Sequence, residues 1–369
     1  MEWGRPETAP LRSMQLTKSK KPSSIVGLDI ETGSIAATEV RANESRTVSR
    51  TAIAPLNPGV VNEGEVLDAE ALSTALKALF SQNKLGKAVR LGIANQRVVV
   101  RTLQLPLIED EKEIDTAVRF RAQDQIPMPL EQAVLDHRVI SRQTGPEGDK
   151  QMEVLAVAAR RDMVISLLGA LRKAGLQPVG IDLSAFGMIR ALDAGPALPV
   201  EGQDEQVQTT TLFCNLGDVT NLAVARNGQC LFTRVAPFGM ESIAQRVAER
   251  DGVALEEARD SLLDVGLEEP IEAFEWDESA DATREALEQG ASKLVDELRL
   301  SLDFYSAQEG ASPIEHVVLC GPGSSVPGLP ERIQVGLGRG IEVMLPPALK
   351  GLDDEDAARL TVSYGLAID

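Results

Sequence analysis

The sequence has few aromatic residues, few cysteines and few histidines. Only 3% of its 369 residues are aromatic, so the hydrophobic core must consist mainly of Leu, Val, Ile and Ala. Cys214, Cys230 and Cys320 are widely spaced, odd in number and each within an apolar run, which argues against a disulfide framework and predicts buried thiols in a reducing compartment. His137 and His316 have no Cys or His at ligand spacing, so they predict no metal site.

Positive charge is also scarce. The net charge is −19, and nucleic-acid recognition requires a basic surface, so nucleic acid is excluded as a partner. Much of the excess negative charge lies between Glu249 and Glu288, a segment that contains 15 acidic residues and only three arginines. This segment predicts a solvated, mostly helical acidic face; a docking site for a basic partner is the alternative.

Long hydrophobic runs are missing as well. No apolar run approaches the ~18 residues needed to span a bilayer, so direct membrane insertion is not expected. Residues 1–23 are basic but are not followed by a hydrophobic segment, unlike a signal peptide. They are interpreted as a disordered leader, with Met14 as an alternative start, and the protein is predicted to be cytoplasmic.

Periodicity and breakers predict mixed α/β structure in two lobes, since 369 residues exceed the ~250–300 at which a single core stops growing. Asp68 is placed to cap a helix, and Asn227-Gly228 predicts a hairpin. Other helices are expected over residues 109–125, 162–174, 185–192, 241–250, 255–264, 283–308 and 363–368. Other strands are expected over residues 88–94, 97–103, 133–141, 152–159, 178–183 and 316–319, and a hinge over 194–208.

Both lobes open with the same arrangement of residues. In the first, a strand delivers Asp29 to a turn over Thr32, Gly33 and Ser34; in the second, Asn215 precedes a turn over residues 217–220. Such turns can direct N–H and hydroxyl groups at phosphate oxygens, and the carboxylate lies where a hydrated Mg²⁺ would bind. Because turn-rich hairpins are common, neither hairpin alone establishes phosphate binding.

A third element lies near the C-terminus. The strand over residues 316–319 runs into Gly321-Pro322-Gly323, which leaves the backbone bare at a strand-to-helix junction. Bare backbone suits the close approach of a nucleotide's sugar and base. The alternative is a glycine-rich turn that only makes a corner.

Together these elements resemble the actin, Hsp70 and sugar-kinase superfamily, and from Val26 onward the finer resemblance is to the PilM family of type IV pilus assembly proteins. The segments that carry it include VGLDI, IAATEV, GVVNEGEVLDAEAL, IPMPLEQAVLDHRVI, AGLQPVGIDLSAFGMIRAL, NLGDVTNLAVARNGQCLFTRVAPFG and DELRLSLDFYSAQ. The resemblance implies an α/β (mixed α+β), two-lobed actin-like ATPase fold with an inserted subdomain of the FtsA and PilM type. The implied division is a first lobe over residues 24–104, 178–200 and 346–369, an inserted subdomain over 105–177, and a second lobe over 201–345 with an acidic helical part near 240–310.

The resemblance also implies a site for ATP and Mg²⁺. Asp29, next to the metal, and the turn of Thr32, Gly33 and Ser34 match the first phosphate loop. The matches elsewhere are Gly217, Asp218, Thr220 and Asn221 in the second phosphate loop, Glu297 and Ser301 beside the purine and ribose, and Gly321 and Gly323 in the adenosine loop. No catalytic base is assigned.

The first phosphate loop departs from the family pattern. Glu31 puts a carboxylate where bare backbone usually faces phosphate, and Ala36 replaces a common basic residue. In the second loop, Asn215 stands at the position where the family usually has an acidic residue, and Asp218 lies inside the turn. Added negative charge next to a triphosphate opposes binding, so weak or absent ATPase activity is expected. Alternatively, Glu31 points outward and the turn shifts by two residues to use Gly33.

The function implied by the resemblance is that of an adaptor. It would bind the N-terminal tail of a PilN-like inner-membrane protein in a groove near Arg101–Val139 and link it to the pilus motor ATPase complex. Self-association is a further possibility of the family. The alternatives are an FtsA-like filament-forming division protein, an active actin-like ATPase, and a sugar or acetate kinase, for which no catalytic acid is placed by motif.

Overall fold

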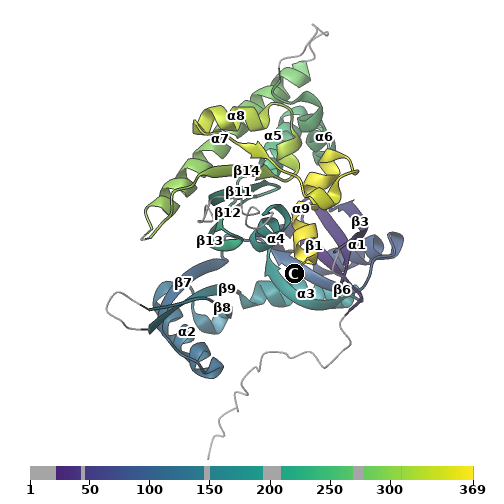
Figure 1. The fold of residues 1–369 in the computed structure, drawn as a ribbon. Coiled ribbons are helices and arrows are strands. Elements are labelled where there is room, and N and C mark those ends of the chain that lie inside the picture. The colour runs from purple at the N-terminus through teal and green to yellow at the C-terminus, as the bar shows by residue number, and fades with distance from the viewer. Residues whose placement is uncertain are drawn as a thin grey trace, which may run out of the picture.

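The computed structural model describes residues 22–42, 46–144, 150–193, 209–268, 278–308 and 310–368. Their strands form two five-stranded sheets, one three-stranded sheet and a short two-stranded hairpin, and helices pack on each of the larger sheets (Figure 1). This is the mixed α/β architecture that the sequence predicts. The domain boundaries themselves stay predictions.

The first five-stranded sheet has the order β10-β6-β1-β2-β3. Its strands are β1 (Ser24–Ile30), β2 (Ser34–Arg41), β3 (Val48–Pro55), β6 (Ala88–Ile93) and β10 (Gln177–Leu183). Helix α1 (Ala69–Gln82) begins where Asp68 accepts hydrogen bonds from the amides of Glu70 and Ala71, both at 2.9 Å, as its capping position predicts. Helix α3 (Arg161–Lys173) packs beside α1 in the same hydrophobic core.

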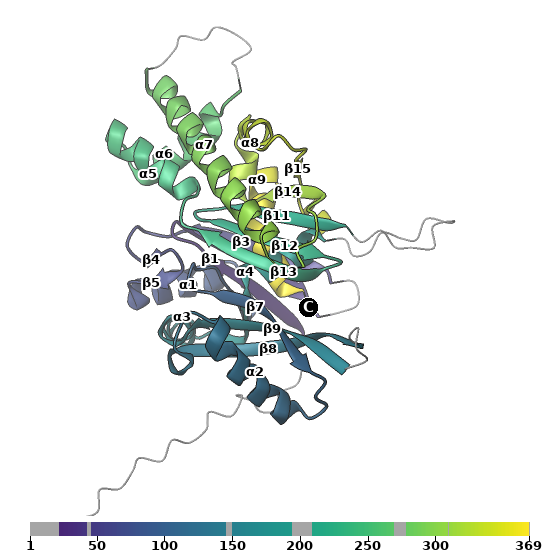
Figure 2. The same cartoon turned by 90° about the vertical axis from the view of Figure 1, so that its left-hand side faces the viewer.

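A three-stranded sheet of order β7-β9-β8 lies apart from the first sheet (Figures 1 and 2). It consists of β7 (Val99–Pro106), β8 (Ala133–Thr144) and β9 (Lys150–Arg160). Helix α2 (Glu111–Gln125) and the short 3-10 helix η1 (Leu130–Gln132) follow β7. Helix α2 covers one face of this sheet, where Ile114 and Val118 pack on Leu103, Met152 and Val154.

The second five-stranded sheet has the order β13-β12-β11-β14-β15. Its strands are β11 (Thr210–Leu216), β12 (Thr220–Arg226), β13 (Gln229–Ala236), β14 (His316–Cys320) and β15 (Glu342–Val343). Asn227 and Gly228 both have positive φ, 52° and 73°, so the predicted Asn-Gly hairpin joins β12 to β13. The helices α5 (Met240–Asp251), α6 (Leu255–Val265), α7 (Glu278–Ser306) and α8 (Leu329–Leu337) cover the face turned away from the first sheet (Figure 1).

Two helices lie between the five-stranded sheets and join them. Helices α4 (Ser184–Leu192) and α9 (Asp354–Ala367) contribute Met188 and Leu366 to one core that also holds Leu28 of the first sheet and Phe213 of the second. Helix α9 is longer than the expected 363–368 helix because it begins after the cap Asp353. The remaining elements are β4 (Val61–Asn62), β5 (Glu65–Val66), and the 3-10 helices η2 (Pro322–Ser325) and η3 (Pro347–Leu349).

The cysteines agree with the sequence interpretation. Cys214, Cys230 and Cys320 are free and buried. Burial raises the pKa of all three thiols, that of Cys230 to about 12. Within the ranges that the structure describes, no helix combines the length and the apolar character that a membrane span requires.

Candidate functional site: two turns that meet between the lobes

The β1–β2 turn and the β11–β12 turn face each other. The amide of Gly33 donates to Oδ2 of Asp218 at 2.6 Å. In return, the amide of Asp218 donates to Oε2 of Glu31 at 3.2 Å. Residues nearly two hundred positions apart in the chain therefore form one site, and the carboxylates accept hydrogen bonds from the turns' own N–H groups.

A small polar cavity lies behind these turns. It is lined by Asp29, Ile30, Glu31, Thr32, Glu63, Gly64, Ala94, Ser184, Asn215, Asp218, Val219 and Asn221, and has about 20 Å³ of room for water. That is enough for a water molecule, whereas pockets for drug-sized ligands measure ~300–1,000 Å³. Asn221, one of the lining residues, has its Oδ1 buried without a hydrogen-bond partner in the protein. A second cavity, of about 10 Å³, adjoins Ser34, Ala36 and Arg359.

The site concentrates negative charge out of water. Burial raises the pKa of Asp29 to about 6, against the opposing hydrogen bond that Ser184 donates to Oδ1 of Asp29 at 3.0 Å. Burial and the neighbouring Asp218 carboxylate raise the pKa of Glu31 well above its usual value. Burial, and then the charge of Glu241, raise the pKa of Asp218 to about 6. Asp29 and Asp218 are therefore held partly in the neutral form near pH 6, and burial disfavours the ionised form of Glu31 as well.

Two arginines stand next to these carboxylates. Arg259 on α6 donates from Nε and Nη2 to the two oxygens of Glu241 at 2.8 and 2.7 Å. Its guanidinium group packs on Gly33, and a Cβ at this position would require the guanidinium group to move. Arg359 on α9 lines the second cavity and bonds Glu355 at 2.9 Å. Arg259 thus brings a positive charge to the turn that lacks a basic residue at Ala36.

Several residues expected in the nucleotide site already have partners within the protein. Thr220 Oγ1 donates to the carbonyl of Phe238 at 2.7 Å, and Thr32 Oγ1 accepts from the amide of Glu63 at 3.4 Å. Glu297 and Ser301 lie on α7 and both bond Arg234 of β13, at 2.9 and 2.6 Å.

The glycine-rich loop is closer to the turns. The loop of Gly321 and Gly323 packs on Asn215 and Leu216, at the end of β11. The structure therefore brings the two turns and the glycine loop together, whereas neither Glu297 nor Ser301 lines either described cavity.

Glu63, Ser184 and Arg259 belong to the site but were not predicted from the sequence. Glu63 has a positive φ of 47°, and the Asn-Glu-Gly-Glu run around it is a turn signal. Ser184 and Arg259 lie within ordinary helices, and no local pattern marks them.

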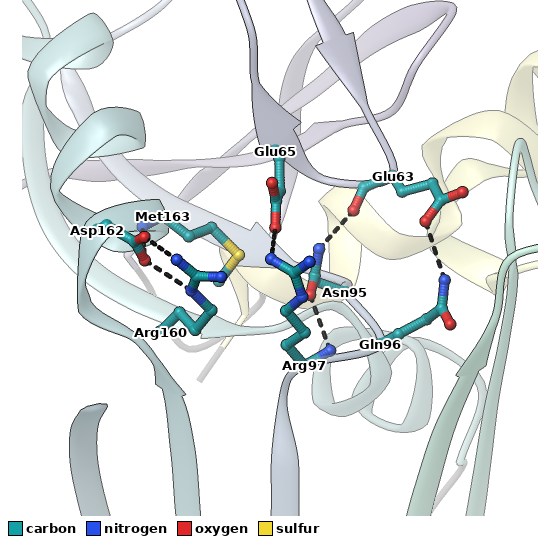
Figure 3. Close-up of polar contacts among 8 residues, drawn as sticks. All are labelled: Glu63, Glu65, Asn95, Gln96, Arg97, Arg160, Asp162 and Met163. Carbon is teal, nitrogen blue, oxygen red and sulfur yellow. Dashed lines mark hydrogen bonds and ion pairs between the residues drawn. The ribbon is translucent and has the colours of Figure 1, made fainter. Parts of the chain in front are cut away.

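The cavity wall continues into the three-stranded sheet. Asn95 Nδ2 donates to the carbonyl of Glu63 at 2.7 Å, and its Oδ1 accepts from the amide of Arg97 at 2.8 Å (Figure 3). Arg97 pairs with Glu65 at 2.7 Å, and the chain then enters β7 at Val99. The returning chain leaves β9 beside the ion pair of Arg160 and Asp162 (Figure 3). Asn95 therefore connects the cavity to the base of the three-stranded sheet.

The fold and the facing turns define a protein with the actin-like ATPase fold. The chain matches the family "Type IV pilus assembly protein PilM" over residues 27–361, and it belongs to that family. It is similar to a solved structure described as the PilM-PilN type IV pilus biogenesis complex, with 26% identity and a TM-score of 0.75, over 93% of this chain and 97% of that one. It is also similar to the ethanolamine utilization protein EutJ from Carboxydothermus hydrogenoformans, with 15% identity and a TM-score of 0.54, over 94% of this chain and 89% of that one. The protein is thus an actin-like component of type IV pilus assembly.

Proposed function

We propose that the protein is a cytoplasmic adaptor that holds the N-terminal tail of a PilN-like inner-membrane protein. The observation that carries the proposal is the similarity, along nearly the whole chain, to a structure described as a complex with PilN. The three-stranded sheet supports it, because α2 covers only one face. On the other face Thr102, Gln104 and Arg138 are exposed, and these residues fall within the Arg101–Val139 region expected to receive the tail.

This face suits an extended peptide. Gln104 Nε2 and Ser141 Oγ donate to the two oxygens of Glu153 at 2.6 and 2.9 Å, so the side chains across β7, β9 and β8 are held in place. Leu155, between Thr102 and Arg138 in the strand register, is only 8% exposed, so polar side chains form most of the surface here. A row of polar groups already fixed in position can bind a short tail with little ordering cost.

The tail-binding test uses a peptide of the first ten or so residues of the PilN-like partner, titrated into the full chain by calorimetry. We expect a Kd in the micromolar range, about −8 kcal/mol. Thr102→Trp places bulk on the exposed sheet face and should weaken binding at least tenfold. Thr116→Trp, the same change on the exposed side of α2, should not. Equal affinities for the two variants would show that the tail binds elsewhere. If the peptide does not bind the wild type, the proposed adaptor function is wrong.

We propose further that ATP with Mg²⁺ enters the cleft only when the lobes move apart. As arranged here, the cavity has room for water but not for a triphosphate, and two of the amides that would face phosphate are bonded to Asp218 and Glu31. Among the described residues, no three acidic, His or Cys side chains converge on a metal position. A Mg²⁺ ion bound by Asp29 would therefore take its other ligands from water and phosphate, which is how Mg²⁺ is usually held. Weak or absent ATP hydrolysis is the corresponding expectation.

Nucleotide and tail should influence each other through Asn95. Because Asn95 bonds both the Glu63 turn of the cavity and the segment entering β7 (Figure 3), a ligand that moves this turn also moves the base of the three-stranded sheet. We expect millimolar ATP·Mg²⁺ to change the binding free energy of the peptide by no more than ~1–3 kcal/mol. Asn95→Ala should remove most of that change while leaving the peptide Kd without nucleotide nearly unaltered. Full coupling in Asn95→Ala, measured by the same titration, would contradict this route.

The other functions make different predictions. Brisk steady-state phosphate release without peptide binding would favour an active ATPase, and polymers seen by light scattering would favour an FtsA-like filament. The pilus motor ATPase complex as a partner and self-association stay predictions.

A further inference from the structure

We infer that the protein carries its own substitute for a bound phosphate: a clasp, formed by Glu31 and Asp218, that closes the cleft between the lobes without nucleotide. The inference rests on the proposed nucleotide site, and it explains why that site does not accommodate a triphosphate in this arrangement.

The geometry of the clasp is reciprocal. Each turn offers one N–H group to a carboxylate of the other: Gly33 to Asp218 at 2.6 Å, and Asp218 to Glu31 at 3.2 Å. Backbone N–H groups at a tight turn are the groups that bind phosphate oxygens. Here these N–H groups donate to carboxylate oxygens, which accept hydrogen bonds much as phosphate oxygens do. The two lobes are therefore tied by bonds of the kind that a nucleotide would otherwise supply.

The surroundings fix the clasp from both lobes. On the second lobe, the carbonyl of Gly217 accepts from the amide of Met240 at 2.9 Å, which holds the turn on the start of α5. On the first lobe, the amide of Glu31 bonds the carbonyl of Ser34 at 2.9 Å, and the carbonyl of Gly33 accepts from Leu56 at 2.8 Å. Each turn is thus also held by hydrogen bonds within its own lobe.

Counter-charges make the clasp tolerable in a buried site. Arg259 packs on Gly33 and bonds Glu241, while Arg359 adjoins Glu31 in the second cavity. The charged groups around the clasp are Asp29 from β1, Glu63 from the β4–β5 turn, Glu241 from α5, Arg259 from α6 and Arg359 from α9. A phosphate that accepts hydrogen bonds from these N–H groups must displace both carboxylates, and it would then lie near Arg259 and Arg359, which are bonded to Glu241 and Glu355.

The clasp can be tested without nucleotide by hydrogen–deuterium exchange of the full chain, read on peptides covering residues 31–36 and 216–221. The amide of Asp218 should exchange at least tenfold more slowly in the wild type than in Glu31→Ala. The amide of Gly33 should likewise exchange at least tenfold more slowly in the wild type than in Asp218→Ala. Glu31→Gln keeps an acceptor oxygen, so it should retain the protection. Exchange elsewhere reports whether each variant is folded. Rapid exchange of both amides in the wild type would overturn the clasp.

Nucleotide binding supplies the second readout. Titration with ATP·Mg²⁺ should give at least tenfold tighter binding to Glu31→Ala than to the wild type, while Glu342→Ala, an exposed acidic residue on β15, should match the wild type. Equal affinity of Glu31→Ala and the wild type would show that the clasp does not compete with phosphate. Because the exchange measurement needs no nucleotide and the peptide titration needs no clasp, failure of this inference is distinguishable from failure of the proposed adaptor function.

Discussion

Replacing Gly365 by alanine is expected to destabilise the protein strongly although it adds only one methyl group. Gly365 lies on α9 where this helix crosses α4, and a Cβ on it would overlap the carbonyl oxygen of Gly187. That neighbour is backbone within a second helix, so it cannot rotate aside. Overpacking of a rigid core costs typically ~1–3 kcal/mol, and a forced helix shift costs more. We expect a loss of about 3 kcal/mol or more in the free energy of unfolding, because the crossing holds both five-stranded sheets.

Gly169 provides the matched control. It also lies within a helix, α3, but nothing stands within 4 Å of the position of its Cβ. Gly169→Ala should stabilise the protein by roughly 0.5–1 kcal/mol, since alanine has the higher helix propensity. Thermal and urea unfolding followed by circular dichroism would measure both changes. A Gly365→Ala protein as stable as the wild type would show that the α4–α9 contact is looser than described.

Much of the fold follows from local sequence signals. The Asp68 cap, the Asn227-Gly228 turn and the apolar stripe of α7 each depend on residues close in the chain, and each appears where it is expected. Strand β3 and helix α8 were missed. The residues of β3 do not alternate cleanly between buried and exposed, because this edge strand is only partly covered. Helix α8 is short and starts directly after the glycine-rich turn.

The site was predictable only as far as its separate turns. Gly33 and Gly217 lie in the hairpin turns and Asp29 lies near the end of β1, as expected, because each hairpin is a local structure. The bond from Gly33 to Asp218 joins residues 185 positions apart, and it depends on how the two lobes pack. No local pattern specifies that packing. The sequence did indicate the chemical conflict at Glu31, and the structure shows that this side chain points across the cleft to the amide of Asp218 instead of outward.

Lowering the pH from 8 to 5 is expected to strengthen the folded state at this site. The folded pKa values of Asp29 and Asp218 are raised from 3.8 to about 6, and that of Glu31 is raised as well. In this window the folded protein keeps protons that the unfolded chain releases, so these groups stabilise it below the ordinary carboxyl pKa. The contribution of Asp29 and Asp218 is lost as the pH rises through about 6. A rise of about two pKa units corresponds to about 3 kcal/mol for one group, and the three groups are too close together for such values to be added.

Glu31→Gln isolates this effect, because it removes the charge and keeps an oxygen that can accept from Asp218. At pH 8 we expect its free energy of unfolding to exceed that of the wild type by about 1–3 kcal/mol, because burial and the neighbouring carboxylates disfavour the ionised form of Glu31, and glutamine cannot ionise. The difference should shrink as the pH falls, because Glu31 in the folded wild type is then neutral too. Glu342→Gln, which makes the same change in net charge on exposed β15, should follow the wild type at every pH. Urea unfolding at pH 5, 6, 7 and 8 would decide the matter: if Glu31→Gln is the less stable protein at pH 8, then Glu31 stabilises the cleft as a full anion, and Arg259 and Arg359 outweigh its carboxylate neighbours.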